Sequence, residues 1–225
     1  MNRLNGRAFG GILKMMVFLA ALVFLPAWTV HYWQGWICLL VFFACVMGIT
    51  LHLMKNDPAL LERRISAGAG AEKEKSQKII QALSSIAFVA LFVVSSIDHR
   101  FGWSVVPAYV AISGDALIVL GLVFVFLVFK ANSFTSGIIE VAADQTVIST
   151  GPYGLVRHPM YLGALIMLFG IPIALGSWWG EIAILPMIAA IVWRLLDEEK
   201  FLMRNLPGYD EYRRKVRRRL LPLLW

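Results

Sequence analysis

The sequence has little charge and few of the residues that build metal sites or nucleophile motifs. Only 16% of its 225 residues are Asp, Glu, Lys or Arg, whereas about 25% is usual in water-soluble domains. Its four histidines are dispersed, and no His-Glu-x-x-His motif, phosphate-binding loop or serine or cysteine nucleophile elbow is visible. We therefore expect no metal in this protein, and an ordinary soluble domain is excluded.

The two cysteines, Cys38 and Cys45, lie within a single apolar stretch. Bridged cysteines have Cα atoms within about 7 Å of each other. A separation of seven residues along one helix exceeds that distance. We expect both to be free thiols that serve as small packing residues.

Long apolar runs dominate what remains. The chain is 59% hydrophobic, with a mean hydropathy of +0.72, and a helix needs roughly 20 residues to cross a bilayer. Because lipid offers backbone groups no partners, such runs must be helical. We predict an all-α, polytopic membrane protein with about six transmembrane helices in one structural unit: an N-terminal part (1–130) with four and a C-terminal part (131–225) with two. The predicted spans are 11–30, 35–54, 79–97, 107–130, 159–175 and 180–196.

The basic residues are distributed unevenly among the loops. Twenty of the 21 lysines and arginines lie toward the two termini, or within or at the edges of the second and fourth loops, and only Arg100 lies in a loop on the other side. By the positive-inside rule, both termini and the even-numbered loops are cytoplasmic. Anionic headgroups then account for the basic surface. We expect a multi-pass protein of the bacterial cytoplasmic (inner) membrane, with the lipid bilayer as partner and no nucleic acid.

Several segments outside the spans also carry a signal. Residues 57–64 are typical of a short amphipathic surface helix, and the mixed polar segment 131–150 should fold back over the cytoplasmic helix ends, forming a cap. Tyr209 and Tyr212 in the tail either lie in the headgroup layer or roof a pocket. Asp115, inside the fourth span, is a functional candidate by position, although pairing with a neighbouring helix near the outer interface is the favoured interpretation.

Polar residues gather at the two ends of the last helical hairpin. Pro159 suits a first helical turn, and a tight turn at 176–180 makes the fifth and sixth spans antiparallel. Residues 157–161 should therefore lie beside residues 194–199 at the cytoplasmic surface. Two interpretations are open: an interfacial belt of snorkelling arginines, tyrosines and ion pairs, or a site for a zwitterionic cofactor.

The motifs in this region resemble those of the integral-membrane methyltransferases of the isoprenylcysteine carboxyl methyltransferase family, to which the phospholipid N-methyltransferases are related. The matching elements are Gly151-Pro152-Tyr153, Arg157-His158-Pro159-x-Tyr161-x-Gly163, Arg194, Glu198-Glu199-x-x-Leu202 and Gly208-Tyr209-x-x-Tyr212-x-x-x-Val216. The resemblance covers roughly residues 130–222. It implies an S-adenosylmethionine site built by the last hairpin, the preceding segment and the cytoplasmic cap.

By position, the resemblance implies ten cofactor-binding residues: Gln145, Thr146, Val147, Ile148, Tyr153, His158, Pro159, Met160, Tyr161 and Glu198. Arg194 takes the place of a residue that contacts substrate. Arg157 and Glu199 are further catalytic candidates.

The implied reaction is methyl transfer to a lipid-like or prenyl-cysteine-like amphiphile, with carboxylate O-methylation favoured. Methyl transfer from a sulfonium is a displacement that depends on how the two reactants are aligned. Alignment can lower the reaction barrier by about 7–11 kcal/mol. A carboxylate acceptor needs no base, whereas an amine would need Glu198, Glu199 or His158 as proton acceptor. Three alternatives stay open: a phospholipid amine N-methyltransferase, a nicotinamide-dependent membrane reductase related to the sterol reductases, and a non-enzymatic transporter or scaffold.

Overall fold

The computed structural model describes residues 3–66, 75–135, 145–222 and 224–225, and within these ranges the secondary structure is helical, without strands. The predicted all-α class is therefore confirmed for this part of the chain. The elements are α1 (Arg3–Ala27), α2 (Trp33–Asn56), α3 (Pro58–Ser66), α4 (Lys75–Phe101), α5 (Ala108–Ala131), η2 (Gly151–Gly154), α6 (Pro159–Ala174), α7 (Trp179–Ile182), α8 (Ile184–Asn205) and α9 (Tyr209–Lys215).

Five of the described helical segments are long and apolar enough to cross a membrane: Arg3–Ala27, Trp33–Asn56, Ser76–Phe101, Ala108–Ala131 and Trp179–Asn205. The remaining predicted span corresponds to α6, which is shorter, with 16 residues. Five long helices and one short helix therefore stand where about six spans were predicted.

The helix that carries the last predicted span, 180–196, continues beyond it, because α8 ends at Asn205. Its charged residues have partners on neighbouring segments and do not terminate the helix. Asp197 accepts hydrogen bonds from Ser76 Oγ at 2.9 Å and Gln77 Nε2 at 2.5 Å. Because Asp197 is hydrogen-bonded to α4, its carboxylate is accommodated within α8 and the helix continues past it.

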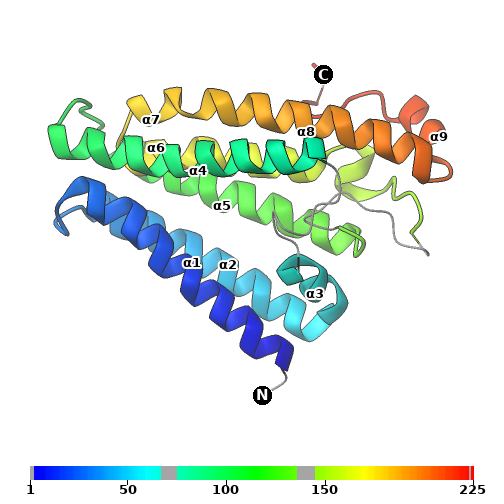
Figure 1. Ribbon diagram of the computed structural model, residues 1–225, viewed down its shortest axis with the longest axis horizontal. Coiled ribbons are helices and arrows are strands. Elements are labelled where there is room, and N and C mark those ends of the chain that lie inside the picture. The colour runs from blue at the N-terminus through cyan, green and yellow to red at the C-terminus, as the bar shows by residue number, and fades with distance from the viewer. Residues whose placement is uncertain (1–2, 67–74, 136–144, 223) are drawn as a thin grey trace.

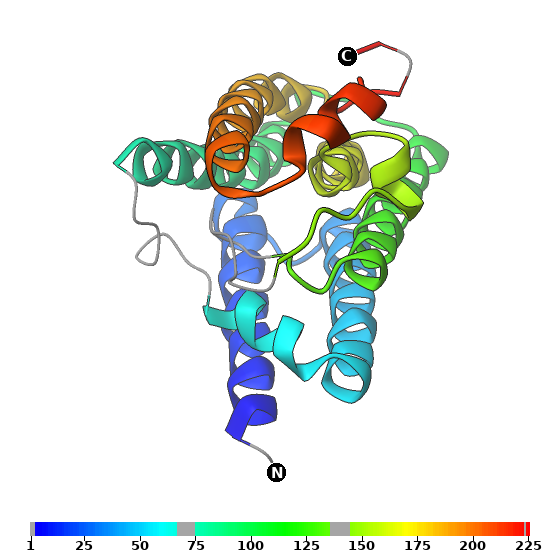
Figure 2. The ribbon, with the colours of Figure 1, turned by 90° about the vertical axis from the view of Figure 1, so that its right-hand side faces the viewer.

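The helices are arranged in layers, with α8 running along α4 and α6 packed closely on α5, while α1 and α2 diverge from the others toward the end that carries α3 (Figure 1). The two helices of the predicted hairpin, α6 and α8, make far fewer contacts with each other than α6 makes with α5 or α8 with α4. Their polar ends nevertheless meet at the end of the bundle shown in Figure 2.

Glycines allow α5 and α6 to approach closely. A Cβ atom added at Gly114 would lie 2.3 Å from the backbone nitrogen of Ala174, and one at Gly121 would lie 2.5 Å from that of Met167. Small residues at such crossings let backbones pack directly against each other in membranes. This contact fixes α6, and with it the polar residues at its start, against α5.

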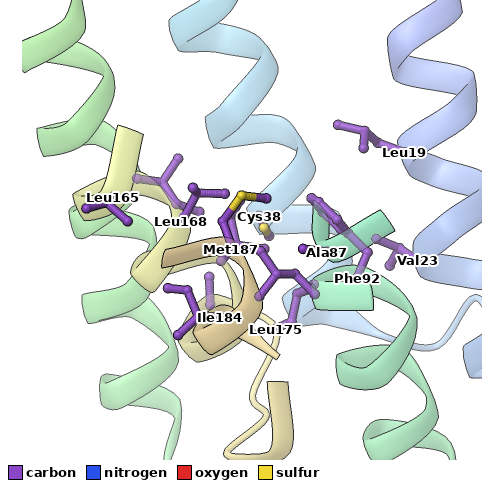
Figure 3. Packing of buried hydrophobic residues seen from close by; sticks show 14 of the residues in the cluster. Leu19, Val23, Cys38, Ala87, Phe92, Leu165, Leu168, Leu175, Ile184 and Met187 are labelled. Carbon is purple, nitrogen blue, oxygen red and sulfur yellow. The ribbon is translucent and has the colours of Figure 1, made fainter. Parts of the chain in front are cut away.

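The main apolar core joins α1, α2, α4, α5, α6 and α8. Leu19, Cys38, Phe92, Leu168 and Met187 are among its members (Figure 3). Cys38 is buried, and both cysteines are free, as expected.

The short helix α3 confirms the amphipathic segment predicted near residues 57–64. Asp57 Oδ1 accepts a hydrogen bond from the Leu60 backbone N–H at 3.0 Å, which satisfies one donor of the first turn. Leu60 and Leu61 are buried in a second apolar cluster that also contains Leu53 and Phe129. Packing against α2 and α5 therefore holds α3 in place.

Asp115 is buried in α5, and neither of its carboxylate oxygens has a hydrogen-bond partner among the described residues. The expected pairing with a neighbouring helix is therefore not found in this part of the chain. His52 lies in α2, and its ring contacts the Phe126 ring edge-on, with 4.8 Å between the two centroids. His52 is not among the residues that line the cavity at the polar end of α6 and α8.

Candidate functional site

A cavity lies where the start of α6, the end of α8, η2 and α9 come together. The empty space in and around it, which includes open solvent at its mouth, is about 870 Å³. Figure 2 looks onto this end of the bundle. All ten predicted cofactor residues line the cavity, as does Arg157: Gln145, Thr146, Val147, Ile148, Tyr153, Arg157, His158, Pro159, Met160, Tyr161 and Glu198. The topology thus gathers them into one hollow, while their binding of a cofactor stays a prediction.

Tyr161 connects the start of α6 to the end of α8. Its hydroxyl donates a hydrogen bond to Glu198 Oε2 at 2.6 Å and accepts one from Arg194 Nε at 3.1 Å. Arg194 Nη1 donates in turn to Gln81 Oε1 on α4 at 3.2 Å. The predicted neighbourhood of residues 157–161 and 194–199 is therefore confirmed. Arg194 lies behind Tyr161 and is not itself among the cavity-lining residues.

Glu199 points away from the cavity and is buried, with 4% of its surface exposed. Its Oε1 accepts from Arg157 Nε at 2.6 Å and from His158 Nε2 at 3.3 Å, and its Oε2 accepts from Arg219 Nε at 3.1 Å. An ionised carboxylate only accepts, so the Nε2 atom of His158 carries the proton in this contact. With both oxygens engaged and none facing the cavity, Glu199 is placed to hold the site together.

Arg157 is also occupied within the protein. Besides Glu199, its Nη1 donates to the carbonyl oxygens of Val216 at 2.9 Å and Arg217 at 3.0 Å. The backbone N–H groups of Arg157 and His158 donate to the carbonyls of Arg218 and Arg219, both at 2.9 Å. The basic tail therefore pairs with the segment before α6. Arg219 was not among the predicted site residues, because the basic run that contains it also suits lipid headgroups.

Tyrosines form much of the remaining wall. Tyr212 Oη donates to the Tyr153 carbonyl at 2.8 Å, and Asn132 Nδ2 donates to Tyr153 Oη at 3.1 Å. Burial raises the pKa of Tyr153 to about 12, although the hydrogen bond from Asn132 opposes this. Burial also raises the pKa of Tyr212 above its usual value. These hydroxyls therefore remain neutral donors at physiological pH.

Tyr209 and Tyr212 decide between the two interpretations of the tail. Both are buried and line the cavity, so they roof a pocket. Gly208, with a φ of +83°, begins the turn that folds α9 back over the site. The Tyr209 hydroxyl is buried without a hydrogen-bond partner among the described residues. Burial, with Glu199 and Glu198 nearby, raises the pKa of Tyr209, so this hydroxyl stays protonated and can donate a hydrogen bond.

Part of the lining was not among the predicted site residues, although Leu202 belongs to one of the matching motif elements. The additional residues belong to the end of α5 and the loop after it, and to the last turns of α8: Asn132, Phe134, Thr135, Leu202 and Leu206. A signal was present, since Leu202 and Leu206 are four apart and share a helix face with Glu198. That face turns toward the cavity.

The lining suits a zwitterion that carries a flat apolar group. Glu198 offers a carboxylate to a cationic group, and Tyr209, whose buried hydroxyl has no hydrogen-bond partner among the described residues, also lines the cavity. Val147, Met160 and Leu202 supply apolar surface. The described ranges contain no group of three or more His, Cys, Asp or Glu residues that could hold a metal ion.

Residues 109–207 match the phospholipid methyltransferase family. The matched region runs from the start of α5 past the end of α8 and contains most of the cavity wall. The resemblance to integral-membrane methyltransferases predicted from the sequence is confirmed over this region. The match and the apolar helices together support an integral-membrane methyltransferase.

Individual relatives carry other names. The chain is 27% identical over 134 residues, 52% of its length, to the cobalt-zinc-cadmium resistance protein CzcN of Cupriavidus metallidurans. It is 27% identical over 137 residues, again 52% of its length, to the nickel-cobalt-cadmium resistance protein NccN of Alcaligenes xylosoxydans xylosoxydans. The chain spans 62% of the length of each. It is also 31% identical over 90 residues to the mouse Delta(14)-sterol reductase TM7SF2, covering 39% of this chain and 22% of that protein.

Proposed function

We propose that this protein transfers a methyl group from S-adenosylmethionine to a lipid-like or prenyl-cysteine-like amphiphile, with a carboxylate as the favoured acceptor. One observation carries the proposal. Ten residues implied by the methyltransferase resemblance line a single cavity, and the Tyr161–Glu198 hydrogen bond closes it on one side. Most of this cavity lies in the region that matches the family.

The residues of the cavity have complementary roles toward such a cofactor. Glu198 faces a positive group, the Tyr209 hydroxyl donates to an anionic one, and the apolar wall near Val147 receives the adenine. When bound, S-adenosylmethionine supplies a sulfonium methyl group, whose transfer to a nucleophile leaves a neutral thioether. The protein contributes alignment and exclusion of water. Glu199 acts through Arg157 and His158, which it holds in position.

The acceptor side of the proposal rests on Arg194. Its guanidinium donates a hydrogen bond to Gln81, which lines a second, more open groove between α1, α4 and α8. Phe18, Phe88 and Met187 supply apolar walls to that groove. An amphiphile with its tail in the groove would bring its head group to Arg194, beside the Tyr161 wall of the cavity.

The proposal also includes a location. The uneven distribution of basic residues favours both termini and the cavity on the cytoplasmic side of a bacterial inner membrane. There the cofactor reaches the cavity from water, and the acceptor reaches it from the bilayer. Neither nucleic acid nor metal takes part.

Calorimetric titration of S-adenosylhomocysteine into the detergent-purified protein tests the cofactor site. We expect binding, and we expect Glu198→Ala to weaken it at least tenfold, about 1.4 kcal/mol. The matched control is Glu211→Ala, which removes an exposed carboxylate that pairs with Lys215 and should bind like the wild type. Equal affinity of the Glu198 variant and the wild type would remove Glu198 from the site.

Two further candidates have specific support. The match to the phospholipid methyltransferase family favours an amine acceptor, for which Glu198 would serve as proton acceptor. The similarity to a sterol reductase favours a nicotinamide-dependent membrane reductase. Titration with NADPH separates the reductase from both methyltransferases, since only the reductase would bind it in the cavity.

A further inference from the structure

A stripe of side chains on α4 changes from polar to apolar along the seam where α8 runs beside it (Figure 1). Gln77 Nε2 donates a hydrogen bond to Asp197 Oδ2 at 2.5 Å. One turn further along α4, Gln81 Oε1 accepts a hydrogen bond from Arg194 Nη1 at 3.2 Å. Beyond Gln81 this face of α4 enters the groove between α1, α4 and α8, which is lined by two serines and then by Phe88. The groove therefore has a polar end beside Arg194 and an apolar end further along α4.

The two serines of the groove, Ser84 and Ser85, differ in how their hydroxyls are used. Ser85 Oγ donates a hydrogen bond to the backbone carbonyl of Gln81 at 2.8 Å, and serines within helices often satisfy their hydroxyls in this way. The Ser84 hydroxyl makes no hydrogen bond with the residues that the structure describes, although Ser84 lines the groove. It therefore presents an unused donor to a molecule that occupies the groove.

This donor lies inside the candidate membrane span and not at its end. The span Ser76–Phe101 has 26 residues, and Ser84 is eight positions from its start, about 12 Å along a helix. The whole span is about 39 Å long. When it is centred in a hydrocarbon layer of about 30 Å, Ser84 lies about 7–8 Å inside that layer. Lipid tails offer a hydroxyl no partner there, and an unpaired donor costs free energy.

The groups along the groove follow the order of those along an acyl amphiphile. At the polar end, Arg194 Nε donates a hydrogen bond to the Tyr161 hydroxyl in the cavity wall at 3.1 Å, so a head group there adjoins the proposed cofactor site. Ser84 comes next, and Phe88 lies one turn beyond it. A plain hydrocarbon chain would leave the Ser84 hydroxyl without a partner. An ester or amide linkage between head group and chain supplies a carbonyl oxygen that accepts a hydrogen bond from it.

We infer that the Ser84 hydroxyl donates a hydrogen bond to a carbonyl oxygen in the chain linkage of the methyl acceptor. The groove then selects an ester-linked or amide-linked acyl amphiphile over one with a plain alkyl or prenyl chain. Ser84 lies outside residues 109–207, which match the methyltransferase family, so it is a specificity residue supplied by the N-terminal half. The inference rests on the proposed function and narrows the class of its acceptor.

Native mass spectrometry of the full chain, released from non-ionic detergent, tests this site by competition. The probes are hexadecanoyl lysophosphatidate and its hexadecyl ether analogue in equal amounts, which differ only in the carbonyl of the chain linkage and are distinguished by mass. Among protein molecules that carry one bound lipid, we expect the wild type to prefer the ester at least about threefold, as one hydrogen bond provides. Ser84→Ala should abolish the preference, and Ser84→Thr, which keeps a hydroxyl, should retain it.

Ser113→Ala is the matched control. It loses a serine hydroxyl on α5, outside the groove, that donates a hydrogen bond to the Val110 carbonyl at 2.6 Å. Because this hydroxyl does not face the groove, the variant should prefer the ester to the same extent as the wild type.

Three results would overturn the inference: equal binding of ester and ether by the wild type, an undiminished ester preference in Ser84→Ala, or an equal loss of preference in Ser113→Ala. If Ser84→Ala does not fold, Ser84→Cys carries a weaker donor of similar size and should show a smaller preference than the wild type. An unchanged preference in that variant would also overturn the inference. The competition needs no cofactor, so a wild type that prefers the ester but does not bind S-adenosylhomocysteine would refute the proposed function and support the carbonyl site.

Discussion

Tyr161 and Glu198 lie 37 positions apart in the chain, and a hydrogen bond of 2.6 Å joins their side chains. This bond links the first turn of α6 to the charged end of α8. The same phenol oxygen accepts a hydrogen bond from Arg194 Nε. One hydroxyl thus connects the group proposed to face the cofactor with the group proposed to face the acceptor.

This separation of roles predicts the behaviour of Arg194→Ala. Turnover should fall at least about a hundredfold, because the acceptor loses its orienting cation, while S-adenosylhomocysteine affinity should stay within about threefold of the wild type. The measurements are methyl transfer from labelled S-adenosylmethionine and calorimetry on the same preparation. Loss of the cofactor affinity would show that the role assignment is wrong.

The unpaired hydroxyl of Tyr209 predicts opposite effects on stability and on binding. Tyr209→Phe removes a buried donor without a described partner, so the unliganded protein should unfold at the same temperature or slightly higher. S-adenosylhomocysteine should bind roughly threefold to tenfold more weakly, because a hydrogen bond to the ligand is lost.

Tyr212→Phe provides the comparison for Tyr209. Its hydroxyl already donates to the Tyr153 carbonyl, so this variant should lose thermal stability even without ligand. Unchanged affinity of Tyr209→Phe for S-adenosylhomocysteine would mean that its hydroxyl does not touch the cofactor.

The buried cluster around Glu199 predicts a large loss of stability. Glu199→Gln leaves Arg157, His158 and Arg219 facing a neutral amide, and breaking a buried ion pair costs about 3–5 kcal/mol. The midpoint of thermal unfolding in detergent should fall clearly. Glu211→Gln breaks only an exposed pair and should change little. A Glu199 variant as stable as the wild type, with turnover abolished, would favour a direct catalytic role instead.

The contact between α5 and α6 predicts that Gly121→Ala is destabilising. The added methyl group would lie 2.5 Å from the Met167 backbone nitrogen, and forcing the helices apart costs about 1–3 kcal/mol. Gly48→Ala is the matched helical control, because a Cβ atom there meets nothing within 4 Å. Unfolding temperatures of the two variants check this, and equal values would show that the close approach is not needed.

The neighbourhood of residues 157–161 and 194–199 could be predicted because topology brings the ends of an antiparallel hairpin together, whereas the ten cofactor residues were implied by the resemblance to the methyltransferases. The sequence did not show which carboxylate faces inward. Glu198 and Glu199 are adjacent, and a helix rotates about 100° per residue, so one turns toward the cavity and the other toward Arg157. Because the two residues are identical and adjacent, composition and spacing do not distinguish the one that faces the cavity.

Long-range pairing was also beyond the sequence argument. The tail residues that pair with Arg157 and His158 carry a basic pattern that suits lipid headgroups equally well. The packing of α6 on α5 had a signal that was not used: Gly114 and Gly121 repeat at the same spacing as Gly163 and Gly170. Such repeats favour close helix contacts in membranes.

The most direct measurement is transfer of tritium from methyl-labelled S-adenosylmethionine into a total bacterial lipid extract, followed by chromatography of the lipid fraction. The account predicts label in an amphiphilic product with the wild type, released by mild base if the product is a methyl ester, and little label with Glu198→Ala. An absence of lipid label from a wild-type preparation that is folded and instead binds NADPH would contradict it.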